Sequence, residues 1–327
     1  MTRLLSGLMA LVAVFFVLSL FTGSGHVAAW DAMMAYFGRG DPLVVMVMQE
    51  LRLPRALMGL LAGASLGMAG AALQGLMRNP LAEPGIVGTS ACAALGAVIA
   101  LQTGVALRFP MALPVAGMIG ALLSVAGLFA LAGAMAGTTT LILAGVAISA
   151  LAGALLSLVL NLSPNPFAAS EITFWMMGSL ADRSFDHVLF ALPFMAFGAA
   201  LIWSARRGLD ALTFGEETAL TMGFSPHRLR LTLVIGTAAL CGATTASIGA
   251  VGFVGLVVPH LLRRAVGGLP SRLLLPSALG GAALVLAADV VVRIWMPERD
   301  LKLGVMTALI GTPVFLHLVW QSRRSLP

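Results

Sequence analysis

The 327-residue chain contains 59% apolar and only 10% charged residues, and its formal net charge is +6 at pH 7. A soluble domain is about half apolar and about a quarter charged, so this composition excludes a soluble globular protein and predicts an integral membrane protein. The only two cysteines, Cys92 and Cys241, lie in apolar stretches, which excludes a disulfide framework and a cysteine-rich metal site.

Charged residues and prolines divide the chain into ten apolar stretches. A bilayer core about 30 Å thick requires about 20 apolar residues per helix, so each stretch is a candidate span. The predicted spans lie near residues 4–22, 54–76, 85–102, 111–135, 141–161, 188–205, 231–248, 252–266, 274–292 and 304–320. The predicted fold class is an all-α integral membrane protein with about ten transmembrane helices, in which residues 1–327 form a single polytopic domain.

The first apolar stretch has two interpretations. It follows Arg3 and could be the core of a signal peptide that is cleaved after Ala29. A run of about 20 apolar residues is longer than a usual signal core, and further spans follow it, so we expect a retained membrane span.

The distribution of charge predicts the orientation of the spans. An even number of spans places both termini on one side of the membrane. If that side is the inner one, the inner segments hold eleven of the 19 basic residues and four acidic residues, a net charge of +7, and the outer segments carry −1. Basic residues are enriched in cytoplasmic loops, so we expect cytoplasmic termini and no nucleic-acid partner for the basic excess.

The second predicted span has small residues at four-residue intervals, namely Gly59, Gly63, Gly67, Ala71 and Gly75. These positions form one stripe on a helix, along which neighbouring backbones can approach closely. Gln74 lies near the inner end of this span. It could form a hydrogen bond between helices or line a pathway, and both interpretations remain open.

Prolines predict three interruptions of the apolar stretches, at residues 79–84, 258–260 and 311–313. Irregular backbone within a membrane is tolerated only where protein or a water-filled cavity satisfies its polar groups. Transporters use such breaks near their pathways, although an ordinary loop explains the first of them equally well.

The loop between the sixth and seventh spans predicts two short helices. Residues 213–222 can form the first, with Glu216 and Glu217 in its first turn and Gly223 as a left-handed cap. The second can start with Ser225 as N-cap and Pro226 at its first position. Two such helices would form a docking knob on the inner face, and a solvated loop is the alternative.

Motifs for catalysis are absent from the sequence. There is no Gly-x-x-x-x-Gly-Lys-[Ser/Thr] phosphate loop, no His-Glu-x-x-His motif and no Gly-x-Ser-x-Gly turn. We therefore expect that the chain is not an enzyme. The five histidines lack the spacing of metal ligands, which predicts no metal site.

Asp289 is the one acidic residue inside an apolar run, close to the outer end of that run. Acidic residues within membrane spans are functional candidates by default. Arg293 follows four residues later, so a helical ion pair between Asp289 and Arg293 is an equally good explanation.

Several motifs, in order along nearly the whole chain, match one family. They are Arg52-Leu53-Pro54-Arg55 before the glycine-rich span, Gln74 with residues 79–85, residues 143–147, 174–180 and 252–260, Ala288-Asp289 with Arg293, and residues 307–313. With these motifs the chain resembles the permeases of type II ABC importers for ferric siderophores, haem and cobalamin. Many members have Glu-Leu-Pro-x-Gly where residues 300–304 read Asp-Leu-Lys-Leu-Gly, which leaves details of the outer face open.

The resemblance implies a homodimer of ten-helix subunits in the bacterial inner membrane, surrounded by lipid, with the pathway along the dimer axis. It implies two cytoplasmic ATP-binding cassette subunits, which bind ATP and Mg, and a periplasmic substrate-binding protein. This chain then has no cofactor of its own. The implied function is ATP-driven import of a bulky metal chelate by alternating access, with ferric siderophore ranked before haem and haem before cobalamin. The alternative is an ion-gradient-driven secondary transporter, which should show paired acidic residues at mid-membrane, whereas Asp289 is alone.

The resemblance also assigns site residues. ATPase coupling is assigned to residues about 214–230, because the family pattern Gly-Glu-Glu-x-Ala-x-x-x-Gly is present there, and it involves Gly215, Glu216, Glu217, Ala219, Gly223, Phe224 and Arg228. The cytoplasmic gate is assigned to Asn79, Leu81, Thr138 and Thr139. The fifth and tenth spans line the pathway and supply Gly145, Ser149, Ser157, Thr307 and Thr312.

Docking of the binding protein is assigned by the resemblance to Arg52, Arg55 and Arg293. These positions match arginines that receive acidic residues on the two lobes of the binding protein. The alternative from the residues alone is that each arginine extends to lipid headgroups or, for Arg293, pairs with Asp289.

Overall fold

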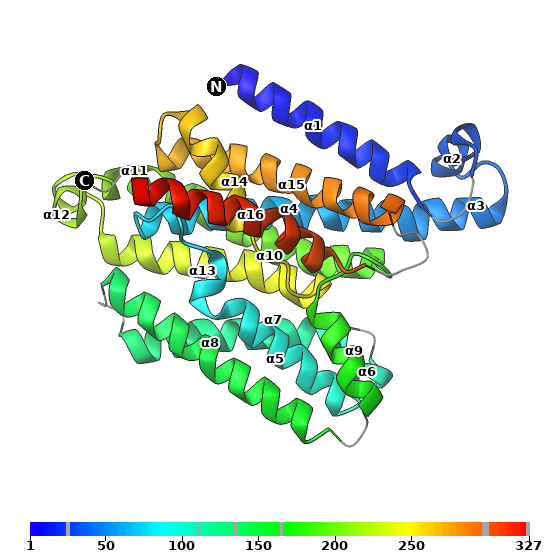
Figure 1. The fold of residues 1–327 in the computed structure, drawn as a ribbon, viewed down its shortest axis with the longest axis horizontal. Helices are drawn as coiled ribbons and strands as arrows, with labels where there is room; N and C mark the ends of the chain where they lie inside the picture. Colours follow the sequence, from blue (N-terminus) through cyan, green and yellow to red (C-terminus); the bar gives the residue numbers. More distant parts are fainter. Residues whose placement is uncertain (24–26, 110, 134–136, 164–165, 296–300, 325–327) are drawn as a thin grey trace.

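The computed structural model describes residues 1–23, 27–109, 111–133, 137–163, 166–295 and 301–324, and the regular structure of these residues is entirely helical. The long helices run roughly side by side along the longest axis of the molecule (Figure 1). We call the end that carries α11 (Arg206–Leu212) and α12 (Glu216–Thr221) the inner end. The opposite end, with α2 (Ala29–Tyr36) and α3 (Pro42–Met46), is the outer end.

Each of the ten predicted spans coincides with a helix. Within the described residues, seven segments are long and apolar enough to cross a bilayer: α1 (Thr2–Phe21), Pro42–Leu76, α7 (Ala112–Ala132), α8 (Thr138–Asn161), α10 (Phe185–Ser204), α13 (Pro226–Ile248) and α15 (Pro270–Trp295). The other three predicted spans contain shorter apolar helices, namely α5 (Thr89–Gln102), α14 (Val254–Arg263) and the apolar part, Leu303–Leu316, of α16 (Leu303–Arg324). The segment Pro42–Leu76 comprises α3, the π-helix η1 (Val47–Arg52) and α4 (Leu53–Leu76).

The glycine stripe of α4 packs against α15, as the sequence predicts. A Cβ atom added to Gly63 would lie 2.3 Å from Gly281 O, and one added to Gly67 would lie 2.0 Å from Ser277 O. A Cβ atom added to Gly70, which lies beside the stripe, would lie 1.9 Å from Gly255 O of α14. These distances leave no room for side chains, so the two long helices touch through their backbones.

The layer formed by α5, α7 and α8 packs on the other side of α13 (Figure 1). Glycines again bring two of its helices together, since a Cβ on Gly96 of α5 would lie 2.2 Å from Ala116 O of α7. Helix α1 lies along one edge of the molecule and α8 along the opposite edge (Figure 1). Short helices α6 (Val105–Arg108), α9 (Pro166–Met176), η2 (Pro84–Val87) and η3 (Arg264–Val266) complete the chain.

Two of the three predicted interruptions are wrong. Pro259 lies inside α14 and Pro313 lies inside α16, and both helices continue through the proline. A proline removes one helical N–H, which for Pro259 leaves Gly255 O without its usual donor. The side chain of Gln74 supplies one, because its Nε2 donates to Gly255 O (3.5 Å) and to Leu256 O (3.1 Å). The interpretation of Gln74 as an interhelical hydrogen bond is thereby confirmed.

The chain is instead interrupted between α13 and α14, at residues 249–253. Gly249 and Phe253 both have positive φ, +79° and +67° respectively. Phe253 is not a glycine, so this backbone conformation is unfavourable and has to be held by its surroundings.

The loop helices at the inner end differ from the prediction in two ways. Residues 206–212 form α11, which the sequence did not predict, and α12 spans only Glu216–Thr221. The second predicted short helix is not separate, because it starts at Pro226 and continues as α13 to Ile248. Its predicted cap is confirmed, since the Ser225 hydroxyl oxygen accepts from the N–H of Arg228 (3.4 Å). The helix continues because no glycine or loop residue follows the first turn of α13.

Candidate functional site

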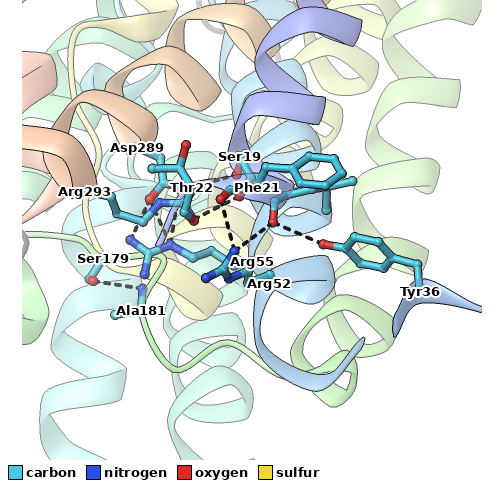
Figure 2. Close-up of polar contacts among 11 residues, drawn as sticks. Ser19, Phe21, Thr22, Tyr36, Arg52, Arg55, Ser179, Ala181, Asp289 and Arg293 are labelled. Carbon is cyan, nitrogen blue, oxygen red and sulfur yellow. Dashed lines mark hydrogen bonds and ion pairs between the residues drawn. The ribbon is translucent and has the colours of Figure 1, made fainter. Parts of the chain in front are cut away.

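The outer end of α1 is capped by an arginine from α15. Carbonyl groups in the last turn of a helix have no following helical N–H to accept from. Arg293 donates from Nη1 to Ser19 O (3.0 Å) and Thr22 O (2.6 Å), and from Nη2 to Ser19 Oγ (2.6 Å) (Figure 2). A cation at the negative end of the helix dipole is favourable, so Arg293 fixes the position at which α1 ends.

A second arginine and a tyrosine complete this cap. Arg52, the last residue of η1, donates to Leu20 O (3.4 Å) and Phe21 O (3.1 Å). The Tyr36 hydroxyl group also donates to Leu20 O (3.2 Å) (Figure 2). Burial raises the pKa of Tyr36 to about 12, so the phenol remains a donor at neutral pH. Four consecutive backbone carbonyl groups at the end of α1 are thus bound by side chains.

Asp289 binds two arginines at the same place. Arg55 donates to Asp289 Oδ1 from Nε (3.0 Å) and from Nη2 (2.7 Å), and Arg293 Nη2 lies 2.6 Å from Asp289 Oδ2. The predicted ion pair between Asp289 and Arg293 is confirmed. The Asp289 side chain is only 2% exposed, and a buried carboxylate needs such paired and hydrogen-bonded partners.

The three predicted docking arginines therefore lie together, with Asp289 among them. We call Arg52, Arg55, Arg293 and Asp289 the outer charge cluster. Its formal charge is +2, from three arginines and one aspartate. Arg52 is buried, the Arg293 side chain is 10% exposed, and both bind the end of α1, whereas the Arg55 side chain keeps an exposed fraction of 22%. The sequence gives no signal for the contacts with α1, because all of the acceptors except Ser19 Oγ are backbone carbonyl groups.

An apolar pocket of about 590 Å³ lies along α16, and its lining residues are Met176, Met177, Ala250, Gly304, Val305, Ala308, Leu309, Thr312 and Pro313. The non-helical segment 249–253 contributes Ala250 to the wall. The start of α16 is fixed there by hydrogen bonds from Leu303 N to Gly178 O (2.9 Å) and from Gly304 N to Met177 O (3.0 Å). Irregular backbone beside a cavity is typical of transport pathways.

The predicted pathway residues are distributed unevenly around this pocket. Thr312 lines it, whereas Thr307 is buried and its hydroxyl group donates to Gly304 O (3.1 Å). On α8, Gly145 is buried, and Ser149 donates to its carbonyl oxygen (2.9 Å). Ser157 lies further along α8 and donates to the carbonyl oxygen four residues earlier. Only Thr312 of the five therefore lines the pocket in one chain.

The predicted gate loop reaches α14 through a residue that the sequence analysis did not single out. Asn79 Oδ1 accepts from Leu81 N (2.9 Å) and closes the turn after α4. Glu83 Oε1 then accepts from Phe253 N (3.1 Å) and holds the N-cap residue of α14. A Cβ added to Gly311 would lie 2.3 Å from Phe253 Cβ, so Phe253 also contacts α16. The gate loop and the pocket helix are thus connected through Phe253.

The other two predicted gate residues, Thr138 and Thr139, form the first turn of α8 at the inner end. Helix α8 packs against η2, which follows Leu81 by three residues. The element that follows Asn79 and Leu81 therefore contacts the helix that begins with Thr138 and Thr139.

The cap of α12 has the predicted left-handed glycine. Gly223 has φ +84°, its N–H donates to Leu220 O (2.9 Å), and the N–H of Phe224 donates to Ala219 O (2.9 Å). This pair of hydrogen bonds is the Schellman motif, which ends a helix and turns the chain sharply. The predicted cap is confirmed in its conformation and in its hydrogen bonds.

The remaining coupling residues surround this turn. Glu216, in the first turn of α12, forms an ion pair with Arg230 of α13. Gly223, Phe224 and Arg228 line one small groove of about 260 Å³. Leu220 of α12 and Met222, directly after it, have exposed fractions of 57% and 54%, so large apolar side chains are exposed here at the inner end. The predicted docking knob is a single short helix with an apolar tip.

Among the described residues, no group of three or more histidine, cysteine, aspartate or glutamate side chains could hold a metal ion.

Comparison with known proteins gives a consistent result. The sequence model of the FecCD transport family matches residues 11–321. The vitamin B12 import system permease protein BtuC of Vibrio cholerae is 38% identical over 299 residues, covering 90% of this chain and 89% of that protein. The Fe(3+) dicitrate transport system permease protein FecD of Escherichia coli is 36% identical over 295 residues, covering 90% and 91% respectively.

A solved structure agrees with the fold. The structure of an inward-facing metal-chelate type ABC transporter superposes with a TM-score of 0.87 at 30% sequence identity, covering 98% of this chain and 100% of that one. The likeness therefore extends over the outer charge cluster, the pocket and the inner knob alike.

Proposed function

The chain belongs to the FecCD transport family, and on that premise we propose that it imports a bulky metal chelate into the cytoplasm by alternating access. The family match over residues 11–321 carries this proposal. Relatives named for ferric dicitrate and vitamin B12 transport support the chelate class. We rank ferric siderophore first, haem second and cobalamin third. The apolar pocket beside α16 suits such cargo, because it offers contact surface without charged groups that would retain it.

We propose a homodimer with the pathway on its axis, lined by α8 and α16. Helix α8 exposes a row of apolar side chains, including Leu143, Val146 and Leu151, away from α5 and α7. Two cytoplasmic ABC subunits would bind ATP and Mg, and this chain would carry no cofactor. Both termini would be cytoplasmic, since the start of α1 and the end of α16 lie toward the inner end (Figure 1).

Coupling to the ATPase subunits is assigned to α12 and the turn that follows it. The Glu216–Arg230 ion pair ties α12 to the first turns of α13, so force on the exposed Leu220 and Met222 reaches a membrane helix directly. A secondary transporter driven by an ion gradient would need a free intramembrane carboxylate, and Asp289 already binds two arginines.

The inner gate can be tested by crosslinking. In a chain with Cys92 and Cys241 replaced by alanine, Thr138→Cys should crosslink to its dimer mate in one nucleotide state and much less in another. Alternating access requires the first turns of the two α8 helices to approach and separate. Leu123→Cys, on the exposed side of α7, is the matched control and should not crosslink in either state. Equal crosslinking at position 138 in both nucleotide states would contradict a moving gate.

The outer charge cluster is proposed to dock an acidic binding protein mainly through Arg55. Its partly exposed guanidinium group can accept a second carboxylate, whereas Arg52 and Arg293 are occupied by α1. Arg55→Gln should weaken docking at low salt at least about tenfold, or about 1.4 kcal/mol, and flatten its salt dependence. Arg39→Gln, an exposed outer residue beyond the cluster, should have little effect.

Docking is measured as binding of the purified binding protein to the permease in nanodiscs. Unchanged affinity of Arg55→Gln at low salt would show that Arg55 serves only to neutralise Asp289.

A further inference from the structure

Helix α2 exposes its large apolar side chains and buries its small ones. Trp30 and Met33 of α2, and Phe37 directly after it, have exposed fractions of 65%, 41% and 75%. They follow the spacing i, i+3, i+7 and therefore lie along one stripe, while Ala32 and Ala35 are buried. A contiguous stripe of large apolar residues is unfavourable in water and indicates an apolar partner.

The orientation of this stripe is fixed by the rest of the hairpin. Ala32 and Ala35 pack with Met48 of η1 in a small buried cluster. The side-chain amide of Gln49 donates to Ala35 O and Tyr36 O, at 3.2 Å each, and so satisfies the end of α2. These contacts fix the orientation of α2, and therefore of the stripe, relative to η1.

The stripe also continues the surface of a membrane span. The rings of Phe21, at the end of α1, and Tyr36, at the end of α2, pack edge to face with centroids 6.4 Å apart. Helix α1 exposes Val14, Leu18 and Phe21 along its length, with exposed fractions of 54%, 43% and 39%. Because α1 is a candidate span with few buried residues, we expect these side chains to face acyl chains.

Two other exposed tryptophans lie at opposite ends of the long helices, and Trp295 lies at the same end as α2. Trp295 ends α15 at the outer end with an exposed fraction of 66%, and Trp203 lies near the inner end of α10 with 42%. Tryptophan concentrates where a bilayer meets water, because its ring is apolar and its N–H needs a polar partner.

We propose that α2 is an interfacial anchor whose Trp30, Met33 and Phe37 insert into the lipid surface at the outer end of α1. A second copy of the chain is a poorer fit for this stripe. The proposed dimer axis is lined by α8, and α8 lies along the edge opposite to the one formed by α1 and extended by α2 (Figure 1). Exposed Asp31 and Arg39 flank the stripe and keep the helix shallow. The expected depth is about 5–10 Å into the boundary between headgroups and acyl chains.

The test is the fluorescence of Trp30 in the full chain reconstituted in vesicles. One variant keeps Trp30 and replaces Trp175, Trp203, Trp295 and Trp320 by phenylalanine. As a second measurement, the difference in fluorescence between the wild-type chain and Trp30→Phe gives the signal of Trp30 without those four replacements. The matched control moves the probe to the exposed turn, as Trp30→Phe with Arg39→Trp in the same background.

Lipids brominated near the carbonyl end of their chains should quench Trp30 at least about twofold more than aqueous iodide does, and more than lipids brominated near the chain end. The probe at position 39 should respond mainly to iodide. Strong quenching of Trp30 by iodide would overturn the proposal and indicate a surface that faces water or a docking protein. Protection from both quenchers would also overturn it, because the stripe would then be covered by protein.

Discussion

Replacing Gly223 with valine is expected to abolish ATP-coupled transport while the chain still folds and inserts. Gly223 has φ +84°, and no atom lies within 4 Å of the position that a Cβ would take. The valine therefore meets no neighbour, and its effect comes only from the left-handed backbone, which costs an L-residue about 1–2 kcal/mol and a β-branched one more. The chain would leave this conformation, and the turn between α12 and α13 would change direction.

The measurement is uptake and ATP hydrolysis in vesicles containing the permease and its ATPase subunits. Gly223→Asn is the graded control, because asparagine tolerates the left-handed region and should retain much of the transport. Coupled uptake at the wild-type level in Gly223→Val would refute the role of this turn. Loss of uptake in both variants would indicate that the glycine is needed for contact and not for its conformation.

Replacing Gly67 with alanine is expected to lower the free energy of unfolding by about 3 kcal/mol or more. The new Cβ would lie 2.0 Å from Ser277 O, which is backbone and cannot rotate away. Helices α4 and α15 would have to separate, and they form the largest interhelical contact of the fold.

Stability is measured as the midpoint of thermal unfolding in detergent, together with the yield of monodisperse protein. Gly7→Ala on α1 is the matched control, since nothing lies within 4 Å of its added Cβ, and alanine in a helix should be neutral or slightly stabilising. A Gly67→Ala protein that unfolds at the wild-type temperature would show that the two backbones are further apart than described.

The sequence predicts the features of this protein that depend on local patterns. Apolar length locates the seven segments of the described residues that are long and apolar enough to cross a bilayer, because the bilayer imposes the same requirement on every span. The cap at Gly223 is equally predictable, since the left-handed turn depends on one residue and its immediate neighbours.

Features that depend on distant partners could not be predicted in this way. The proline at position 259 indicated a break, but Gln74 on another helix satisfies the carbonyl group that it frees. The real interruption at residues 249–253 depends on Glu83, 170 residues away from Phe253 in the chain. The arginines were located through family motifs, yet their contacts with the end of α1 involve backbone acceptors that every residue possesses.

The backbone contacts of α4 have a consequence for movement. Where side chains separate two helices, changes of rotamer can accommodate small shifts of one helix against the other. At Gly63, Gly67 and Gly70 no side chain lies between α4 and the backbones of α15 and α14, so such shifts cannot be accommodated there. These three helices are expected to travel as one rigid block during a transport cycle. Two non-helical segments lead out of this block, residues 77–83 toward η2 and α5 and residues 249–253 toward α13, and we expect deformation to concentrate in them.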